Sequence, residues 1–173
     1  RNAGIKYQGF TYPERFYSLS TPFRFEDELQ DLSYVTYMAD PGEWCLMLRT
    51  PELWRLMFPV PPDEHEDLTL SDKATQARLQ GFYPRSEEYD VRHRTLYHVQ
   101  QRVAETYRKD RVILIGDAAH ANNPLGGMGL NSGVHDAYNL KEKLLLVLQG
   151  KSDETLLDVY SAQRKKVSIE HVN

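Results

Sequence analysis

An aspartate and a group of glycines are the residues in this chain best suited to binding a ligand. Asp117 follows a short apolar run at 112–115, and Gly126, Gly127 and Gly129 come soon after it. A carboxylate at the end of a buried strand lies where open α/β sheets bind ligands, and it can accept hydrogen bonds from ribose or polyol hydroxyls. Glycines allow the backbone to turn freely and to approach a ligand closely. The segment therefore predicts a binding site.

The segment after the glycines predicts a helix that begins near Asn131. Apolar residues recur there at spacings of three and four as far as Leu148, and Gly150 follows at the position expected for a C-terminal cap. The start of such a helix directs free N–H groups and a positive dipole end toward a ligand. We therefore expect hydrogen-bond donors beside the Asp117 carboxylate.

The glycines also form a near match to a dinucleotide fingerprint, Gly127-x-Gly129-x-x-Ser132. That motif must follow its strand directly, whereas ten residues separate Ile115 from Gly126. The acidic residue expected about 20 positions further on would fall inside a helix instead of at a strand end. The glycines are therefore not interpreted as the nucleotide loop of a first strand.

The first two-thirds of the chain predicts an antiparallel sheet. Runs rich in β-branched and aromatic residues, joined by short turns, lie at 15–20, 32–39, 43–49, 53–58 and 90–99. Residues 101–108 fit either a short helix or a continuation of the last strand. The acidic stretch 59–67 predicts a solvated loop, and Ser71 predicts the N-cap of a helix to about Gln80.

The last third predicts a change of architecture. The run at 112–115 is wholly apolar, which suits a strand buried on both faces. Ser152 is expected to cap a final helix. Together the elements predict an α+β fold in which an antiparallel sheet precedes a single buried strand, a glycine-rich loop and C-terminal helices.

Bulk properties exclude several classes of protein. Hydrophobic residues at 40% and charged residues at 27% are typical of a globular chain. The net charge of −4 argues against nucleic acid and anionic membranes as partners, and no apolar run approaches the roughly 18 residues of a membrane span. The single cysteine, Cys45, cannot form an internal disulfide and favours the cytoplasm. The histidines share no metal-ligand spacing, and His120 is expected to be a structural hydrogen-bonding residue.

The site segment resembles a known family motif over about 30 residues. It runs Arg111-Val-Ile-Leu-Ile-Gly-Asp-Ala-Ala-His-x-x-x-Pro-x-Gly-Gly-x-Gly-x-Asn-x-Gly-x-x-Asp-Ala-x-Asn-Leu140. This is similar to the second flavin motif of the class A flavoprotein monooxygenases, the FAD enzymes of the para-hydroxybenzoate hydroxylase and phenol hydroxylase type. The helix departs from the family pattern in the stretch Asn139-Leu-Lys-Glu-Lys-Leu144, where the family usually has a Trp before the Lys.

The resemblance implies roles for particular residues. Asp117 matches the aspartate that binds the ribityl chain of FAD, and Pro124 matches a proline whose carbonyl faces the reactive edge of the flavin. The stretch 127–131 matches the loop and helix start whose N–H groups meet the pyrimidine side of the ring. The cofactor-binding residues expected on this basis are Gly116, Asp117, Pro124, Gly126, Gly127, Met128, Gly129, Leu130 and Asn131. No residue is singled out as catalytic, and no metal is expected.

The resemblance also implies an activity and a division of the chain. The parent enzyme would use NAD(P)H and O2 to hydroxylate an aromatic or similarly activated small molecule through a flavin hydroperoxide. Residues 1–108 would form the substrate-binding sheet region and 109–173 the C-terminal part of an FAD-binding domain of α/β type. The aromatic, Met and Arg side chains available for a substrate pocket are Tyr34, Tyr37, Met47, Arg49, Trp54, Tyr83 and Tyr97.

The N-terminal GxGxxG unit of the family is absent from the sequence. We therefore expect the chain to be a fragment whose partner is the missing nucleotide-binding segment. On its own it should be inactive and hold FAD weakly, and it should tend to form homo-oligomers. Two other interpretations stay open at this point: a non-enzymatic small-molecule binding module that has lost its cofactor half, and a flavin reductase acting on isoprenoid chains.

Overall fold

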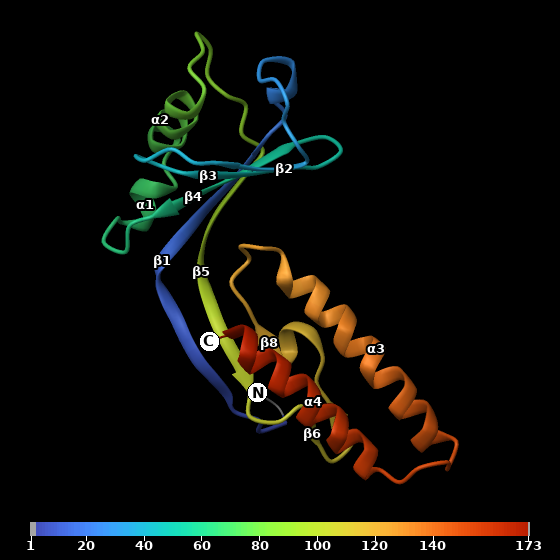
Figure 1. Cartoon of the computed structure of the whole chain (residues 1–173). Coiled ribbons are helices and arrows are strands. Elements are labelled where there is room, and N and C mark those ends of the chain that lie inside the picture. The colour runs from blue at the N-terminus through green and yellow to red at the C-terminus, as the bar shows by residue number, and fades with distance from the viewer. Residues whose placement is uncertain (1–2, 173) are drawn as a thin grey trace. The chain divides into compact units, whose positions relative to one another are not determined.

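The computed structural model describes residues 3–172, and the side chains of residues 3–170 (Figure 1). The chain forms two compact units. The sheet unit comprises Pro13–His98, and the helical unit comprises the described residues of Arg1–Tyr12 and Val99–Asn173. Two long strands, β1 (Tyr7–Thr21) and β5 (His93–Ala104), contribute residues to both units. The expected functional division at residues 108 and 109 stays a prediction.

The sheet unit is built from antiparallel strands, as the sequence predicts. Besides β1 it contains β2 (Val35–Met38), β3 (Cys45–Arg49) and β4 (Trp54–Val60), in the order β2-β3-β4-β1. The pairs β2–β3, β3–β4 and β1–β4 are all antiparallel, with Met57 of β4 opposite both Leu46 and Ser18. The four strands expected at 15–58 are therefore confirmed, with β2 shorter than its apolar run.

Helices cover one face of this sheet. They are η1 (Phe25–Asp27), α1 (Glu66–Thr69) and α2 (Asp72–Phe82). Ser71 caps α2 as predicted, since its Oγ accepts the Ala74 N–H at 3.2 Å, and the helix continues two residues past Gln80. Alternate strand residues face α2 and form one continuous apolar core. Its buried members are Tyr17, Leu19, Phe25, Cys45, Met47, Trp54, Leu56, Phe58, Val60, Leu79 and Tyr89.

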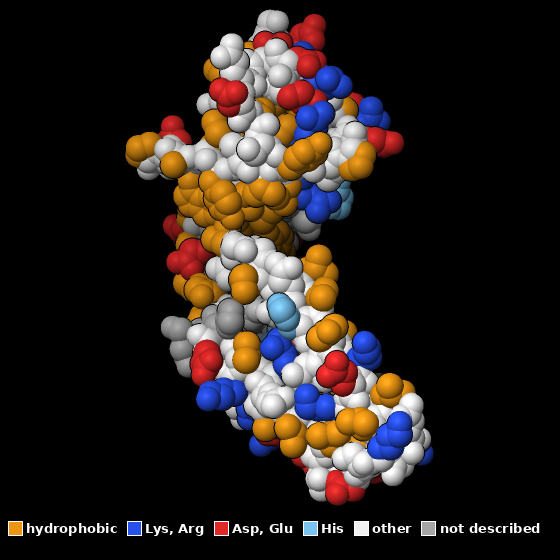
Figure 2. All heavy atoms as spheres, turned by 45° about the vertical axis from the view of Figure 1, so that its right-hand side comes forward, with side chains coloured by type: hydrophobic (Ala, Val, Ile, Leu, Met, Phe, Trp, Pro, Cys, Tyr) orange, Lys and Arg blue, Asp and Glu red, His pale blue; other side chains and the backbone are white. Residues whose placement is uncertain are grey.

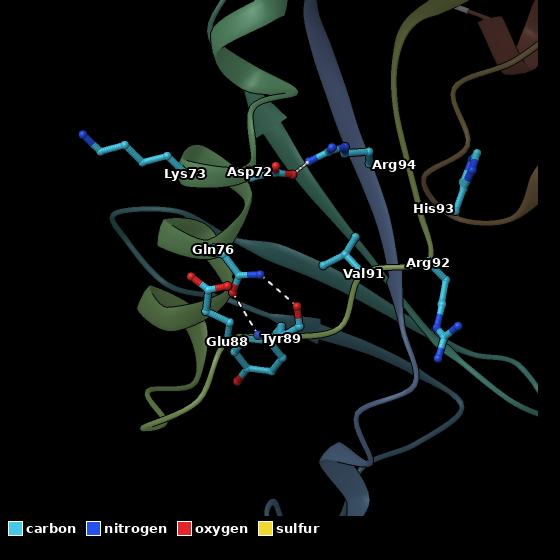
Figure 3. Close-up of a pocket in the computed structure, with 9 residues that line it drawn as sticks. All are labelled: Asp72, Lys73, Gln76, Glu88, Tyr89, Val91, Arg92, His93 and Arg94. Atoms are coloured by element: carbon cyan, nitrogen blue, oxygen red, sulfur yellow. Dashed lines mark hydrogen bonds and ion pairs between the residues drawn. The ribbon is translucent and has the colours of Figure 1, made fainter.

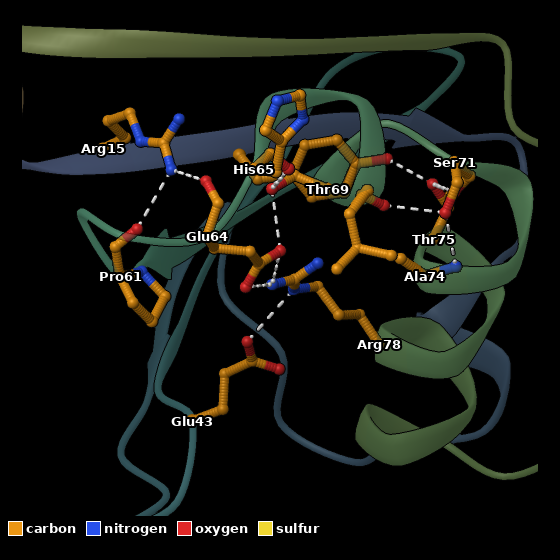
Figure 4. Close-up of polar contacts among 12 residues, drawn as sticks. Arg15, Glu43, Pro61, Glu64, His65, Thr69, Ser71, Ala74, Thr75 and Arg78 are labelled. Atoms are coloured by element: carbon orange, nitrogen blue, oxygen red, sulfur yellow. Dashed lines mark hydrogen bonds and ion pairs between the residues drawn. The ribbon is translucent and has the colours of Figure 1, made fainter.

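A polar cluster at the edge of this core changes the interpretation of the acidic stretch 59–67 (Figure 4). Arg78 of α2 bonds Glu64 at 3.0 Å and Glu43 at 3.2 Å. Arg15 of β1 donates to the carbonyl oxygens of Pro61 and Glu64. Burial alone raises the pKa of Glu64, but hydrogen bonds from Thr69 and Arg78 outweigh it and lower that pKa. Glu64 is thus a structural ion-pair partner, not a solvated charge.

The helical unit contains the chain's last elements. They are the C-terminal part of β5, then β6 (Arg108–Lys109), β7 (Val112–Ile113), η2 (Gly116–Ala118), β8 (His120–Ala121), α3 (Met128–Leu148) and α4 (Thr155–Val172). Of the two alternatives for 101–108, strand β5 continues as far as Ala104. Strand β8 pairs antiparallel with β5, with Val103 opposite His120. A small core joins Val103, Ala104, Tyr107, Ala119 and Tyr160.

Three expectations for this unit are wrong in detail. The run 112–115 is not a strand buried on both faces: only Val112–Ile113 is a strand, it pairs antiparallel with β6, and Val112 and Ile115 are 46% and 42% exposed. Apolar composition indicates burial but does not specify the neighbours that provide it. Helix α3 begins three residues before Asn131, at Met128. Asp153, in place of Ser152, accepts the Thr155 N–H at the start of α4, at 2.9 Å.

Candidate functional site

The Asp117 backbone lies in a tight turn. Gly116 has a φ of 53°, a conformation that side chains other than glycine's rarely adopt. The Ala119 N–H donates to the Gly116 carbonyl at 2.8 Å and closes the turn. The Tyr7 hydroxyl donates to the Asp117 carbonyl at 2.9 Å. These two hydrogen bonds hold the backbone on both sides of Asp117, and neither of them uses its side chain.

The Asp117 carboxylate is exposed and has no hydrogen-bond or ion-pair partner among the described residues. Burial, followed by the negative charge of Asp117, raises the pKa of Tyr7 to about 12. Tyr7 therefore remains a protonated donor to the backbone at neutral pH. A carboxylate on a fixed turn with open acceptor positions is suited to the hydroxyl groups of a ligand.

Two pockets of the helical unit meet at Asp117. The larger has a volume of about 670 Å3 and is lined by Ala3, Ile5, Lys6, Tyr7, Gln100, Arg102, Ala104, Leu114, Asp117 and Ala118. The smaller has a volume of about 340 Å3 and is lined by Asp117, Ala121, Asn122, Pro124, Gly127, Gly129 and Leu130. The structure thus brings five of the nine sequence-predicted residues together around the smaller pocket.

Side chains and turns hold the loop that leads to the glycines. The Gln101 side chain of β5 accepts the Asn123 N–H at 2.9 Å, and the Asn123 side chain accepts the Leu125 N–H at 3.0 Å. The Pro124 carbonyl accepts the Gly127 N–H at 3.1 Å. A carbonyl has two lone pairs, so this bond leaves Pro124 one further acceptor position.

The glycines reverse the chain into α3. Gly126 and Gly127 have φ values of 84° and 67°, and Gly127 is the N-cap of the helix without any side-chain cap. Met128, Gly129 and Leu130 consequently form the first turn of α3, where the N–H groups have no partner one turn back. The Asn131 side chain donates to the Gly127 carbonyl at 3.1 Å and fastens this turn. Gly116, Gly126, Met128 and Asn131 do not line the pocket, although each is next in the chain to a residue that does.

Asp136 is a buried residue beside the turn whose importance sequence reasoning missed. Its side chain is 0% exposed. It accepts the Gly116 N–H at 2.9 Å, the His120 Nε2–H at 2.8 Å and the Arg164 Nε–H at 2.5 Å. His120 is thus a structural hydrogen-bonding residue, as expected. The signal for Asp136 was its place in the Gly-x-x-Asp part of the motif, four residues before the apolar Leu140 and so on the same face of its helix.

The charge of Asp136 is balanced inside the protein. Burial alone raises the pKa of its carboxyl, but hydrogen bonds from His120, Arg164 and the Gly116 amide outweigh it and lower that pKa. Arg164 of α4 supplies the compensating charge and also donates to the Ser132 carbonyl of α3 at 3.3 Å. The cluster therefore ties the Gly116 turn, the first part of α3 and α4 to one carboxylate.

The candidate substrate side chains of the sheet unit do not form one group. Arg49 lies over the Tyr34 and Trp54 rings, at 5.8 Å from each centroid, but the others are dispersed. Met47 and Trp54 lie in the core beneath the helices, while Tyr34 and Tyr37 are exposed on or beside β2. Tyr97 lies on the face opposite that core.

An aromatic layer covers this opposite face. The Tyr97 ring stacks on Phe16 at a centroid distance of 5.9 Å, and Phe16 meets Trp44 at 5.7 Å. Phe16 alternates with the core residue Tyr17, which places it on the other side of β1. Figure 2 shows hydrophobic side chains gathered over the strands of this unit. Phe16 and Trp44 were not among the side chains expected for the substrate.

The sheet unit also has a pocket of about 770 Å3 that contains none of the expected site residues (Figure 3). One pair of its charged side chains is joined within the pocket, since Arg94 bonds Asp72 at 2.5 Å. Gln76 exchanges two hydrogen bonds with the Tyr89 backbone, at 2.8 and 2.9 Å, and so fastens α2 to the segment before β5. These contacts hold the fold of the sheet unit together.

The described residues contain no cluster of three or more His, Cys, Asp or Glu side chains placed to hold a metal ion. Within residues 3–172, none of the helices combines the length and the apolar character that crossing a bilayer requires. Cys45 is buried and unbridged, and burial raises the pKa of its thiol to about 12. The polar turn and the glycine loop are suited to an organic cofactor.

Comparison with known proteins identifies that cofactor. The whole chain, residues 1–173, matches the family described as FAD binding domain. The chain belongs to this FAD-binding family. It is 35% identical over 176 residues to the para-nitrophenol 4-monooxygenase of Pseudomonas sp. (strain WBC-3), covering 96% of this chain and 42% of that protein. It is 38% identical over 173 residues to a 3-(3-hydroxy-phenyl)propionate/3-hydroxycinnamic acid hydroxylase of Escherichia coli (strain K12 / DH10B). This match covers 95% of this chain and 29% of that protein.

Solved structures support the same fold. The flavin-dependent monooxygenase PieE, whose crystal structure is in complex with FAD and substrate, matches with a TM-score of 0.84 and 28% identity over 98% of this chain and 30% of that one. The α+β fold expected from the sequence is therefore confirmed. The FAD-binding chain spans less than half the length of the relatives it matches. The unpaired Asp117 carboxylate, the left-handed glycines and the uncapped start of α3 are groups that fit a flavin with a polyol chain.

Proposed function

We propose that the protein containing this chain is an FAD-dependent monooxygenase that hydroxylates an aromatic small molecule. One atom of O2 enters the substrate as a hydroxyl group, the other leaves as water, and NAD(P)H with a proton supplies the reducing equivalents. The observation that carries the proposal is the exposed Asp117 carboxylate, on a fixed turn beside the start of α3, in a chain that matches an FAD-binding family throughout.

Each part of the site has a distinct role in this proposal. The Asp117 carboxylate accepts hydrogen bonds from the ribityl hydroxyls of FAD, and the turn that holds it positions the chain of the cofactor. Pro124 places its carbonyl at the edge of the flavin ring. Within 127–131, the free N–H groups of the first turn of α3 address the pyrimidine side. FAD, once bound, supplies the redox and oxygen-transfer chemistry, and the protein supplies binding and orientation.

The start of α3 also stabilises charge. Negative charge develops on the pyrimidine side of a flavin when it is reduced, and fixed N–H donors stabilise such charge without reorganising. Gly127 leaves those donors without a side-chain cap, so they are available to the cofactor. We expect this interaction to favour the reduced form of FAD and hence its acceptance of hydride.

The sheet unit is proposed to bind the substrate. Phe16, Trp44 and Tyr97 form an aromatic layer on the face away from the helices. Phe16 is only 5% exposed, so the partly exposed Trp44 and Tyr97 offer the surface on which an aromatic ring could stack. Relatives are named for acting on para-nitrophenol and on 3-(3-hydroxy-phenyl)propionate. We therefore propose a hydroxylated aromatic ring as the substrate class, with residues 1–108 as the substrate-binding region and 109–173 as the flavin-binding part.

The pyrophosphate and adenosine end of FAD is proposed to be held outside this chain. The sequence has no GxGxxG unit that follows a strand directly, so a nucleotide-binding segment is the expected partner. That the isolated chain is inactive and forms homo-oligomers, and that the protein is cytoplasmic, stay predictions. The non-enzymatic alternative is not favoured, because the match to the FAD-binding family includes the whole chain.

The test is to purify the full-length protein, measure its flavin content, and supply it with NADH or NADPH and a panel of phenols under 18O2. The expected result is a bound flavin, substrate-dependent oxidation of the nicotinamide, and one 18O atom in the product. A full-length protein that binds no flavin would overturn the proposal, as would one that binds flavin but transfers no oxygen to any aromatic compound.

A further inference from the structure

The turn that carries Asp117 is anchored to Asp136 at both of its ends. At the start of the turn the Gly116 N–H donates to the Asp136 Oδ2 atom at 2.9 Å. Immediately after the turn the His120 Nε2 donates to the same oxygen at 2.8 Å. The peptide between these two points contains Asp117, so one carboxylate oxygen determines where the residue proposed to bind the ribityl chain is placed.

The other Asp136 oxygen connects this turn to the helices. It accepts the Arg164 Nε–H at 2.5 Å, and Arg164 also donates to the Ser132 carbonyl in the second turn of α3 at 3.3 Å. A Cβ atom built on Gly133 would lie 3.4 Å from the Gly116 Cα atom, so the turn packs directly on the helix backbone. The distance between Asp117 and the start of α3 is therefore set by the contacts of Asp136 together with the packing of Gly116 on Gly133.

The burial of the cluster makes these contacts rigid. Asp136 is 0% exposed and the His120 side chain 1% exposed, so water cannot replace a lost partner cheaply. Arg164 balances the charge of Asp136, and the His120 proton on Nε2 is assigned from the hydrogen bond to Asp136. None of the three side chains lines either pocket at Asp117. Their influence on a ligand can only be indirect.

We propose that Asp136, with His120 and Arg164, is a positioning cluster that fixes the Asp117 carboxylate relative to the N-terminus of α3, so that one FAD molecule can contact both. The proposal rests on the proposed flavin function, because FAD is the ligand that would contact both the Asp117 carboxylate and the N-terminus of α3. Asp136 itself touches neither cofactor nor substrate. Its replacement should loosen the turn and weaken FAD binding, in addition to its cost to the stability of the fold.

The test uses three variants of the full-length protein. Asp136→Asn removes the charge that pairs with Arg164. Its NH2 group cannot accept a hydrogen bond, so one of the two acceptor oxygens that Gly116, His120 and Arg164 share is lost. Asp136→Glu keeps the charge but lengthens the side chain by one methylene, which displaces the Gly116 turn. Glu64→Gln is the matched control, because it removes a partly buried carboxylate that pairs with an arginine in the sheet unit.

Three quantities are measured: the dissociation constant for FAD, the flavin reduction potential, and hydrogen exchange of the backbone amides at 116–118. For both Asp136 variants we expect roughly tenfold weaker FAD binding, about the loss of one charge-assisted hydrogen bond, a shifted potential, and faster exchange at 116–118. Glu64→Gln should change none of the three, even where it lowers the melting temperature.

The outcomes separate this inference from the proposed function. Wild-type protein that binds no FAD overturns the proposed function. If the wild-type protein binds FAD and the folded Asp136 variants have the same FAD affinity and flavin reduction potential, the positioning role alone is overturned. If neither Asp136 variant folds, His120→Leu decides, because it removes one end of the anchor and leaves the Asp136–Arg164 pair. An FAD affinity unchanged in that variant, with unchanged exchange at 116–118, also overturns the inference.

Discussion

The two units of this chain distribute their apolar and charged residues differently. In the sheet unit one continuous core joins β1, β3, β4 and α2, and its ion pairs lie at the edge of that core. In the helical unit the core is small, a charged cluster is fully buried, and α3 exposes Leu130 and Leu148 to 80% and 76%. The sheet unit is stabilised mainly by its own apolar burial, whereas the helical unit depends on polar contacts and leaves apolar surface uncovered.

This difference agrees with the two proposed roles. A substrate layer needs a stiff sheet behind it, which an apolar core of interdigitating side chains provides. A cofactor site needs exact placement of a few polar groups, which buried hydrogen bonds provide at a cost in desolvation. The exposed apolar side chains of α3 form a surface suited to contact with the nucleotide-binding segment proposed above.

The largest expected effect tests the core of the sheet unit. Phe58 is 1% exposed within that core. Phe58→Ala should lower the free energy of unfolding by about 3–5 kcal/mol, because it removes a buried ring and leaves a cavity. Chemical denaturation measures this, with the exposed Phe10→Ala as the control. A loss below about 1 kcal/mol for Phe58→Ala would mean that the sheet unit does not rely on its own core.

The next effect tests the flavin contact in the helical unit. Asp117→Ala in the full-length protein removes hydrogen bonds to a charged acceptor, worth about 1.5–3 kcal/mol, so the FAD dissociation constant should rise roughly 10- to 150-fold. The exposed Asp117 side chain has no partner among the described residues, so stability without FAD should hardly change. Titration followed by flavin fluorescence measures the affinity. An unchanged affinity would remove Asp117 from the site.

A smaller effect concerns pH. The pKa of Glu64 is lowered in the folded protein, because the hydrogen bonds from Thr69 and Arg78 outweigh its burial. A group with a lowered folded-state pKa stabilises the fold above its unfolded pKa, about 4.3 for glutamate, and loses that contribution as pH falls through the folded value. Unfolding of wild type should therefore become easier below about pH 4.3, and Glu64→Gln should be less sensitive to pH in that range. Equal pH slopes would refute the role of the ion pair.

The smallest effect concerns the exposed surface of α3. Leu130 contacts little else in this chain, so Leu130→Ser should change the free energy of unfolding of the chain by less than about 0.5 kcal/mol. It should also reduce self-association, because exposed apolar patches promote it. Denaturation and sedimentation of the two proteins measure these quantities. A large loss of stability would show that this face is covered in solution by another copy of the chain.

The strands of the sheet unit and the cap of α2 could be predicted from local sequence. Strand periodicity at 15–20 and 43–49 reports which residues alternate between two environments, and Ser71 bonds a backbone N–H only three residues away. The cofactor segment was likewise recognisable, since Asp117 and the glycines are close together in the chain and follow a specific pattern. Features of this kind depend on residues that are close together in the chain, so the sequence alone can predict them.

Contacts between distant residues required the tertiary structure. The apolar run 112–115 indicated burial, but only the fold shows that β7 pairs with β6 and leaves Val112 partly exposed. Glu64 resembled a solvated charge until Arg78 was found beside it. Asp136 meets Gly116, His120 and Arg164 from positions 20, 16 and 28 residues away. The sequence by itself determined which residue types stand between Gly116 and Asn131 and where glycines allow the chain to turn. Only tertiary packing decided which buried charges meet, because those pairings depend on how separate elements pack against one another.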